Sequence, residues 1–129
     1  MELNKGTLTE TVLWTNSSPT SSFSAQKVTL NDNISNYTYI KIISKMLTSR
    51  SEEETFIFPV DFIKTCTSGG SDGSPKPKLV VGGAQTSINN ARQAYYASDT
   101  SIYFMANYRL NQSGSNNTWH VPIQIIGMK

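Results

Sequence analysis

Hydrophobic and polar side chains alternate with a period of two along most of this chain. The clearest example is YTYIKIISKML, residues 37–47, which is rich in β-branched and aromatic residues. Such alternation is typical of a β-strand, because successive side chains of a strand point to opposite faces. One face of this strand carries Ile40, Ile42 and Met46, and the other carries Tyr39, Lys41, Ile43 and Lys45.

Similar short segments recur at intervals of roughly 8–12 residues with turn signals between them, which is typical of an all-β sandwich or barrel. We predict a single-domain antiparallel β-sandwich, jelly-roll-like, of about seven or eight strands. One short helical turn is expected near residues 87–92. The predicted strands cover residues 11–15, 23–30, 37–47, 55–60, 79–85, 91–98, 101–110 and 119–129.

The loop at residues 16–22 is polar and contains Pro19, yet bulky Trp14 and Phe23 flank it. Aromatic residues bury a large area, so these two side chains can fix both ends of the loop in one core. We therefore expect the loop to be structural. The predicted core contains Trp14, Phe23, Ile40, Ile42, Phe56, Phe58, Phe104 and Ile125.

Two further polar segments separate the predicted strands. Residues 49–54, SRSEEE, are expected to form a hairpin tip with the three glutamates in solvent. Pro59 lacks a backbone N–H group and marks a strand end or a sheet edge. Residues 67–78 carry three glycines and two prolines and form the clearest loop in the sequence.

Length and charge exclude several classes of protein. A chain of 129 residues fits one domain, and a net charge of +2 gives no field strong enough to attract nucleic acid or an anionic membrane. Cys66 and His120 are the sole cysteine and histidine, so we expect no intrachain disulfide and no Cys/His zinc cluster. The sequence has no apolar segment long enough for a signal peptide or a membrane span, so we predict neither.

Motifs that carry catalysis are sparse. A Ser/His/Asp arrangement around His120 has no G-x-S-x-G turn to support it, so the sequence favours a neutral histidine beside a strand aromatic. The glycines of residues 69–73 lack the rest of a phosphate-binding loop. We predict a protein that is not an enzyme, with no catalytic residue, no cofactor and no metal.

Adjacent aromatic residues provide a second kind of candidate site. In a strand, one member of each pair Tyr95–Tyr96 and Tyr103–Phe104 faces the core and the other faces outward. Outward tyrosines can stack on sugar rings or anchor a protein interface; ordinary cross-strand pairing is the alternative. The candidate ligand or interface residues are Tyr95, Tyr96, Tyr103, Tyr108 and Trp119.

Both ends of the chain resemble a known module. Residues 13–26 carry a Leu-Trp-Thr-Asn, Pro-Thr-Ser and Phe-x-x-Gln pattern, residues 92–104 resemble a penultimate hairpin, and residues 119–129 end in a Pro-x-x-Ile-x-Gly strand. This pattern resembles the C-terminal β-rich module of tail, fibre and head-decoration proteins of tailed bacteriophages that infect Gram-positive bacteria. Residues 49–84 depart from it, so the resemblance defines no ligand surface there.

The resemblance implies an arm at residues 1–12 and a sandwich module at residues 13–129. Because the chain starts shortly before the module, the expected function is a virion surface protein that decorates the capsid and helps adhesion to host glycans. The alternatives are a tail-tip receptor-binding or carbohydrate-binding protein and an enzyme accessory domain. We expect attachment through residues 1–10 or the C-terminal IIGMK segment.

The resemblance also implies partners and a location. The expected partner is the major capsid protein or a tail protein of the virion, with a host cell-surface glycan as a second ligand and a homo-oligomer, such as a trimer, as the assembly form. Neither nucleic acid nor a membrane is expected as a partner. The protein would be made in the host bacterial cytoplasm and would reside on the surface of the phage particle.

Overall fold

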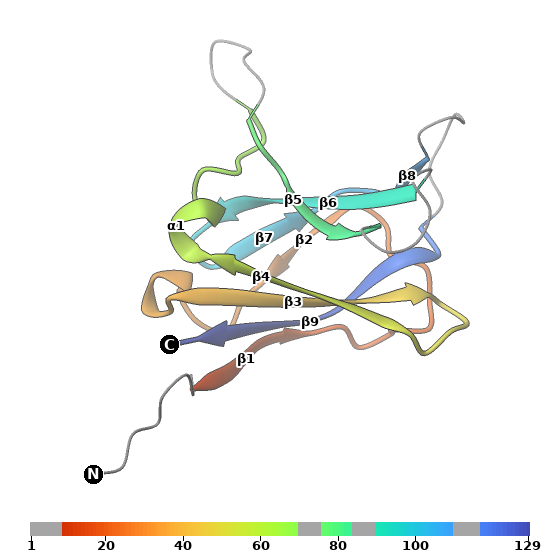
Figure 1. The fold of residues 1–129 in the computed structure, drawn as a ribbon, viewed down its shortest axis with the longest axis horizontal. Coiled ribbons are helices and arrows are strands. Elements are labelled where there is room, and N and C mark those ends of the chain that lie inside the picture. The colour runs from red at the N-terminus through yellow and green to blue at the C-terminus, as the bar shows by residue number, and fades with distance from the viewer. Residues whose placement is uncertain (1–8, 70–75, 84–89, 110–116) are drawn as a thin grey trace.

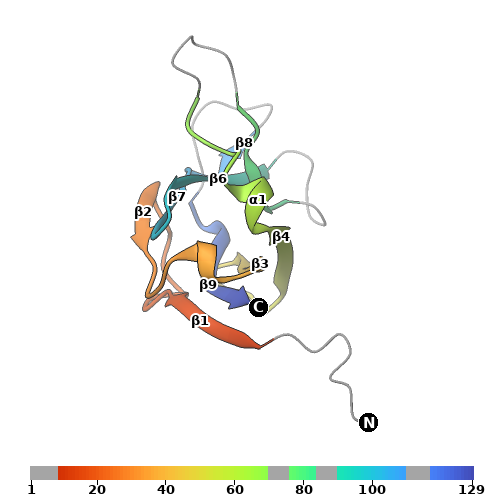
Figure 2. The same cartoon turned by 90° about the vertical axis from the view of Figure 1, so that its left-hand side faces the viewer.

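Two antiparallel β-sheets pack face to face in the computed structural model, which describes residues 9–69, 76–83, 90–109 and 117–129 (Figures 1 and 2). The prediction of a single-domain all-β sandwich is confirmed. The first sheet has the order β1 (Glu10–Thr15), β9 (Trp119–Met128), β3 (Tyr39–Leu47), β4 (Glu53–Pro59). The second has the order β2 (Gln26–Thr29), β7 (Ser101–Phe104), β6 (Asn90–Ser98), β5 (Leu79–Gly82), and β8 (Tyr108–Arg109) pairs with β6.

Each predicted strand has a counterpart in the structure, and the differences are local. The segment predicted at residues 23–30 is a strand only from Gln26 to Thr29, and the segment at 101–110 divides into β7 and β8. The predicted helical turn near 87–92 is wrong from residue 90 onward, where β6 begins, and its earlier part lies outside the described residues.

Two short helical elements connect the strands at one end of the sandwich. They are the 3-10 turn η1 (Ile34–Asn36) and the helix α1 (Val60–Ile63), which the sequence analysis did not predict. Pro59 ends β4, as expected, and its extended backbone leads directly into α1. Val60 and Ile63, three residues apart, are both buried, so a single turn suffices to seal this end of the core.

A bulge in β1 explains the aromatic anchors around the first loop. The register with β9 shifts between Val12 and Trp14, so Leu13 and Trp14 both lie near Ile125 instead of pointing to opposite faces. The Trp14 ring lies 6.1 Å from Phe23 and 5.8 Å from Phe104, between ring centroids. The loop therefore connects β1 to the segment that precedes β2, and the aromatic side chains at its two ends meet in the core.

The core lies between the sheets and contains most of the predicted residues. Phe23, Ile40, Ile42, Phe104 and Ile125 are buried. Trp14 and Phe58 are partly buried against this cluster, and Phe56 stacks on Phe58 with 6.4 Å between ring centroids. Alternation along β3 holds as predicted, with Ser44 at a buried position between Ile42 and Met46.

The first described residues and the C-terminus lie side by side in the first sheet. Glu10 pairs with Met128, and the Lys129 backbone N–H donates to the Thr9 carbonyl, so residues 9–12 of the predicted arm pair with β9 of the same chain. Residues 1–8 are outside the described part of the chain. Among the helices that the structure describes, none has the length and apolar character needed to span a membrane.

Candidate functional site

The outer face of the first sheet carries an unusual number of apolar side chains. The register places Val12, Ile126, Lys41 and Ile57 in one row across the four strands, because partners in a ladder share a face. Val12 is 45% and Ile57 53% exposed. We call this surface the apolar face; its apolar members are Val12, Tyr39, Ile43, Ile57, Ile126 and Met128.

One ion pair interrupts the apolar face. The Lys41 Nζ atom lies 3.0 Å from the Glu10 Oε1 atom. This pairing neutralises the charge at the centre of the face, and the lysine stem adds further apolar area around it. The face thus joins uncharged apolar surface from both ends of the chain and from β3 and β4.

The second sheet carries two of the candidate tyrosines on its outer face. Tyr95 of β6 is the register partner of Tyr103 of β7, and their rings stack with 4.9 Å between centroids and 18° between planes. The Lys78 Nζ atom lies 5.9 Å from the Tyr95 ring centroid, and Lys27 of β2 is the register partner of Tyr103. We call these four side chains the tyrosine–lysine row.

The other three candidates do not belong to this row. Tyr96 faces the core, and its hydroxyl donates to Asp99 Oδ1 at 2.7 Å, which holds the pKa of that carboxyl below its usual value. Tyr108 is 36% exposed in β8, and Trp119 is partly buried beside the His120 ring. No ring contact joins Tyr108 or Trp119 to the row among the described side chains.

A buried polar pair that the sequence did not predict lies inside the sandwich, near the starts of β4 and β9. The His120 Nδ1 atom is 2.9 Å from Glu54 Oε1, and these side chains expose 0% and 1% of their surface. The same carboxylate oxygen accepts the Gly83 backbone N–H at 3.3 Å. His120 has a φ of 50°, a conformation that non-glycine residues rarely adopt, so the local backbone is strained.

This pair corrects the prediction that all three glutamates of the hairpin lie in solvent. Glu52 and Glu53 are exposed, but Glu54 belongs to β4 and points inward opposite Ser44. The signal was present in the sequence, because Glu54, Phe56 and Phe58 share one strand face. Because Glu54 follows other charged residues in SRSEEE, the local pattern assigns it to the solvent-exposed turn and not to the strand.

Arg92 extends the buried polar region from the second sheet. Its guanidinium donates only to backbone carbonyls among the described residues: to His120 at 2.7 Å, Met105 at 2.8 Å and Trp119 at 3.1 Å, with a longer contact to Asn117. Burial lowers the pKa of Arg92 to about 10. Arg92 therefore holds the start of β9 in place. Because it is buried, a substrate in solvent would not reach it.

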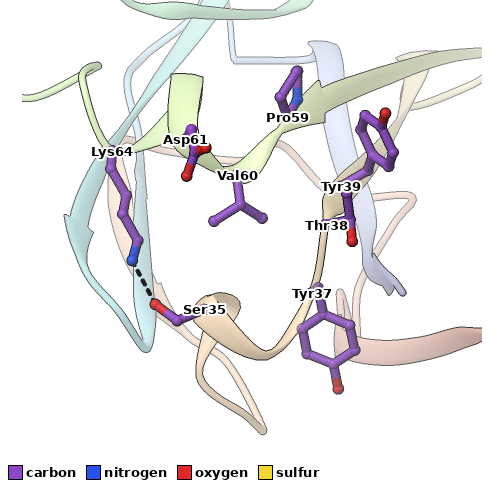
Figure 3. A pocket seen from close by; sticks show the side chains of 8 residues that line it. All are labelled: Ser35, Tyr37, Thr38, Tyr39, Pro59, Val60, Asp61 and Lys64. Carbon is purple, nitrogen blue, oxygen red and sulfur yellow. Dashed lines mark hydrogen bonds between the residues drawn. The ribbon is translucent and has the colours of Figure 1, made fainter.

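A pocket of about 320 Å³ opens at the end of the sandwich closed by α1 (Figure 3). Tyr37, Thr38 and Tyr39 form one side of it, Lys64 and Ser35 form the other, and Val60 points in from above (Figure 3). The Lys64 ammonium donates to the Ser35 hydroxyl and lies 3.6 Å from Asp99 Oδ1. Because the lysine is already paired, the pocket offers no free cation for an anionic ligand.

A second pocket of about 280 Å³ lies against the first loop, between Trp14, Phe23 and the serines that follow Asn16. The Asn16 side chain stabilises this loop by donating to the Pro122 carbonyl at 2.9 Å and accepting the Ser18 N–H at 2.8 Å. The polar groups of the loop thus satisfy its own backbone, in agreement with a structural role.

The remaining candidate groups give no reactive site in the described part of the chain. Cys66 is buried, and burial raises the pKa of its thiol, which disfavours the nucleophilic thiolate. No three His, Cys, Asp or Glu side chains among the described residues are grouped to hold a metal ion.

Comparison with known proteins assigns no family. No family model matches the chain, and no curated protein matches its sequence.

Proposed function

We propose that this protein is a non-enzymatic component of a bacteriophage virion surface, a capsid decoration protein that attaches through its apolar face. The observation that carries the proposal is the exposure of Val12 and Ile57 at the two edges of one sheet face. Half-buried Ile43 and Met128 lie on the strands between them, as does Ile126, which is only 6% exposed. Exposed apolar side chains gathered on one face often mark interaction sites on soluble proteins. The resemblance of the chain ends to phage structural modules supplies the identity of the partner.

Two features support attachment by a face in preference to strand addition. β9 lies between β1 and β3, so the main-chain groups of the C-terminal segment are already paired, while the side chains of Ile126 and Met128 join the apolar face. Thr9 and Glu10 pair with the C-terminal segment of the same chain, so they do not extend away as an arm, although β1 is an edge strand of the sheet. The interface at the apolar face would have an apolar centre and a polar rim, as stable interfaces have.

The buried Glu54–His120 pair supports the non-enzymatic part of the proposal. Acid–base catalysis requires the proton-transferring group to reach the substrate. Exposed fractions of 0% and 1% deny such access to this histidine and carboxylate. Their polar atoms instead connect β4 to the start of β9.

The test is incorporation into virions of the phage that encodes the chain. Ile57→Lys places a charge in the apolar face, and we expect it to reduce the amount of protein on purified particles while the unfolding transition stays within about 0.5 kcal/mol of wild type. Thr29→Lys, an exposed position in β2 of the other sheet, is the matched control and should be incorporated normally.

A truncation that lacks residues 1–8 separates the two modes of attachment. If the truncated chain is incorporated normally and Ile57→Lys is not, attachment through the apolar face is supported. Normal incorporation of Ile57→Lys would overturn it, and loss of the truncated chain alone would assign attachment to the N-terminal segment.

The second candidate function is that of a tail-tip receptor-binding protein. The tyrosine–lysine row favours it, because aromatic and basic side chains on an outward face suit a ligand outside the particle. The number of copies per particle distinguishes the two functions, since a decoration protein covers the capsid and a tip protein occurs in few copies.

A further inference from the structure

The tyrosine–lysine row crosses the second sheet at right angles to its strands. Register and ring contacts give the order Lys27, Tyr103, Tyr95, Lys78. Neighbouring strands lie about 4.8 Å apart, so the backbones of the two lysines are separated by about 14 Å. Two positive charges therefore flank two phenol groups on one flat surface.

The stack of Tyr95 on Tyr103, with 4.9 Å between ring centroids, covers one face of each ring, and Lys78 lies over Tyr95 at 5.9 Å. Neither phenol hydroxyl has a hydrogen-bond partner among the described residues. The row thus offers two hydroxyls, each able to donate and accept, beside rings whose facing sides are closed by the stack.

The surrounding charge is of one sign. Strands β2, β5, β6 and β7 contain no aspartate or glutamate. Lys27 is exposed and forms no ion pair with a described residue. Lys78 donates one hydrogen bond, to the Lys76 carbonyl at 3.0 Å, which leaves its other N–H groups for a ligand.

We propose that the tyrosine–lysine row binds an anionic polysaccharide. Each lysine contacts a carboxylate or phosphate group, and the two phenol hydroxyls form hydrogen bonds with the sugar hydroxyls between these anions. The inference rests on the proposed place of the protein on the virion surface and names a ligand class for the glycan adhesion expected from the sequence. The row lies on the sheet opposite the apolar face and acts without it.

The geometry favours a saccharide over a single-stranded nucleic acid. Nucleobases bind by stacking on free aromatic faces, and here the faces between the two rings are closed. Nucleic-acid affinity also depends on many phosphate contacts, and this row supplies two cations. An anionic polysaccharide has widely spaced anionic groups that match the two lysines, and its sugar hydroxyls match the tyrosine hydroxyls between them.

The experiment uses the isolated chain on an array of carboxylated, phosphorylated and neutral oligosaccharides, with an oligo(dT) strand titrated in parallel. We expect binding to the anionic glycans, and the preferred class identifies the anion. Binding only to neutral glycans, tighter binding to oligo(dT), or no binding to any glycan would each overturn the proposal.

Variants of outward-facing residues test the row itself. Lys27→Gln with Lys78→Gln should weaken binding at least about tenfold, because charge-assisted hydrogen bonds are lost. Tyr95→Phe with Tyr103→Phe keeps the stacked rings and removes the hydroxyls, so it should also weaken binding. Unchanged affinity in both double variants contradicts the site.

Lys45→Gln, on β3 of the other sheet, is the matched control and should bind as wild type does. Thermal unfolding of each variant verifies that the sandwich is intact. Ile57→Lys should still bind the glycan even where it fails to join virions, so failure of this proposal and failure of the attachment proposal give different results.

Discussion

His120 and Glu54 form a contact of 2.9 Å in the interior of the sandwich, although 66 residues separate them in the sequence. Glu54 comes from the edge strand β4, and His120 comes from the start of β9. The pair therefore links β4 to β9 over the inner face of β3, which lies between them in the first sheet. Its polar atoms make the alignment of these two strands specific, because a shift of either strand would leave a buried charge or ring nitrogen without its partner.

Removal of either partner should destabilise the protein strongly. We expect His120→Ala and Glu54→Ala each to lower the free energy of unfolding by about 3–5 kcal/mol, the usual cost of breaking a buried pair. Chemical denaturation of both single variants and the double variant measures this, and the double variant should cost less than the sum. Glu53→Ala, at the exposed neighbouring position, is the control; a wild-type midpoint for His120→Ala would contradict the assigned role.

Gly127 should tolerate no side chain while Tyr37 is present. A Cβ atom at this position would lie 2.6 Å from Tyr37 Cδ1, so the ring would have to move. We expect Gly127→Ala to cost about 1–3 kcal/mol of stability, as overpacking does. The same substitution in a Tyr37→Ala background should cost clearly less in thermal unfolding; an equal cost in both backgrounds would exclude the ring as the cause.

Acid should destabilise the end of the sandwich that contains η1. Hydrogen bonds, the first from the Tyr37 hydroxyl and the next from the Asn33 backbone, hold the pKa of Asp32 below its usual value, and the Tyr96 hydroxyl does the same for Asp99. A lowered pKa means that the carboxylate stabilises the fold above its ordinary pKa near 3.8. That stabilisation is lost as the pH falls through the lowered pKa.

Substitution of these aspartates should make the free energy of unfolding depend less on pH in the acid range. We expect Asp32→Asn and Asp99→Asn to show less loss of unfolding free energy than wild type between about pH 5 and pH 2. Asp61→Asn is the control, since the Asp61 carboxylate accepts no hydrogen bond from a described residue. Identical pH profiles for wild type and both variants would refute the role of these carboxylates.

The aromatic contact across the two sheets should be one of the main sources of stability. Phe104 is fully buried, and its ring centroid lies 5.6 Å from Phe23 and 5.8 Å from Trp14. We expect Phe104→Ala to cost about 3–5 kcal/mol, as large core truncations do. Tyr103→Ala, next to it on the outer face, should cost much less. A reversed order in denaturant unfolding would contradict the assignment of inner and outer faces.

The strands were predictable because their signal is local. Alternation in residues 37–47 specifies which side chains face the core, and the structure buries Ile40 and Ile42 accordingly. The glutamate pair was harder to predict, because a polar residue at an inner position is satisfied only by a distant partner. Glu54 lies on the inner face that Phe56 and Phe58 define, but nothing in the local sequence identifies His120 as its partner.

The site was predictable in part for the same reason. Alternation predicted that one member of each pair Tyr95–Tyr96 and Tyr103–Phe104 faces outward, and the structure places Tyr95 and Tyr103 on the outer face. Their stacking, and the position of Lys27 and Lys78 beside them, depends on strand order and register, which link segments far apart in the chain. The bulge at Leu13 and Trp14 is likewise a property of the pairing with β9.

The most direct test of the proposed function is quantitative mass spectrometry of purified virions from the phage whose genome encodes this chain. We expect the protein to co-purify with the particles in a copy number comparable with that of the major capsid protein, and we expect Ile57→Lys to lower this number sharply. Absence of the wild-type protein from washed particles would contradict the central claim, and a copy number of only a few per particle would assign the protein to the tail tip instead of the capsid.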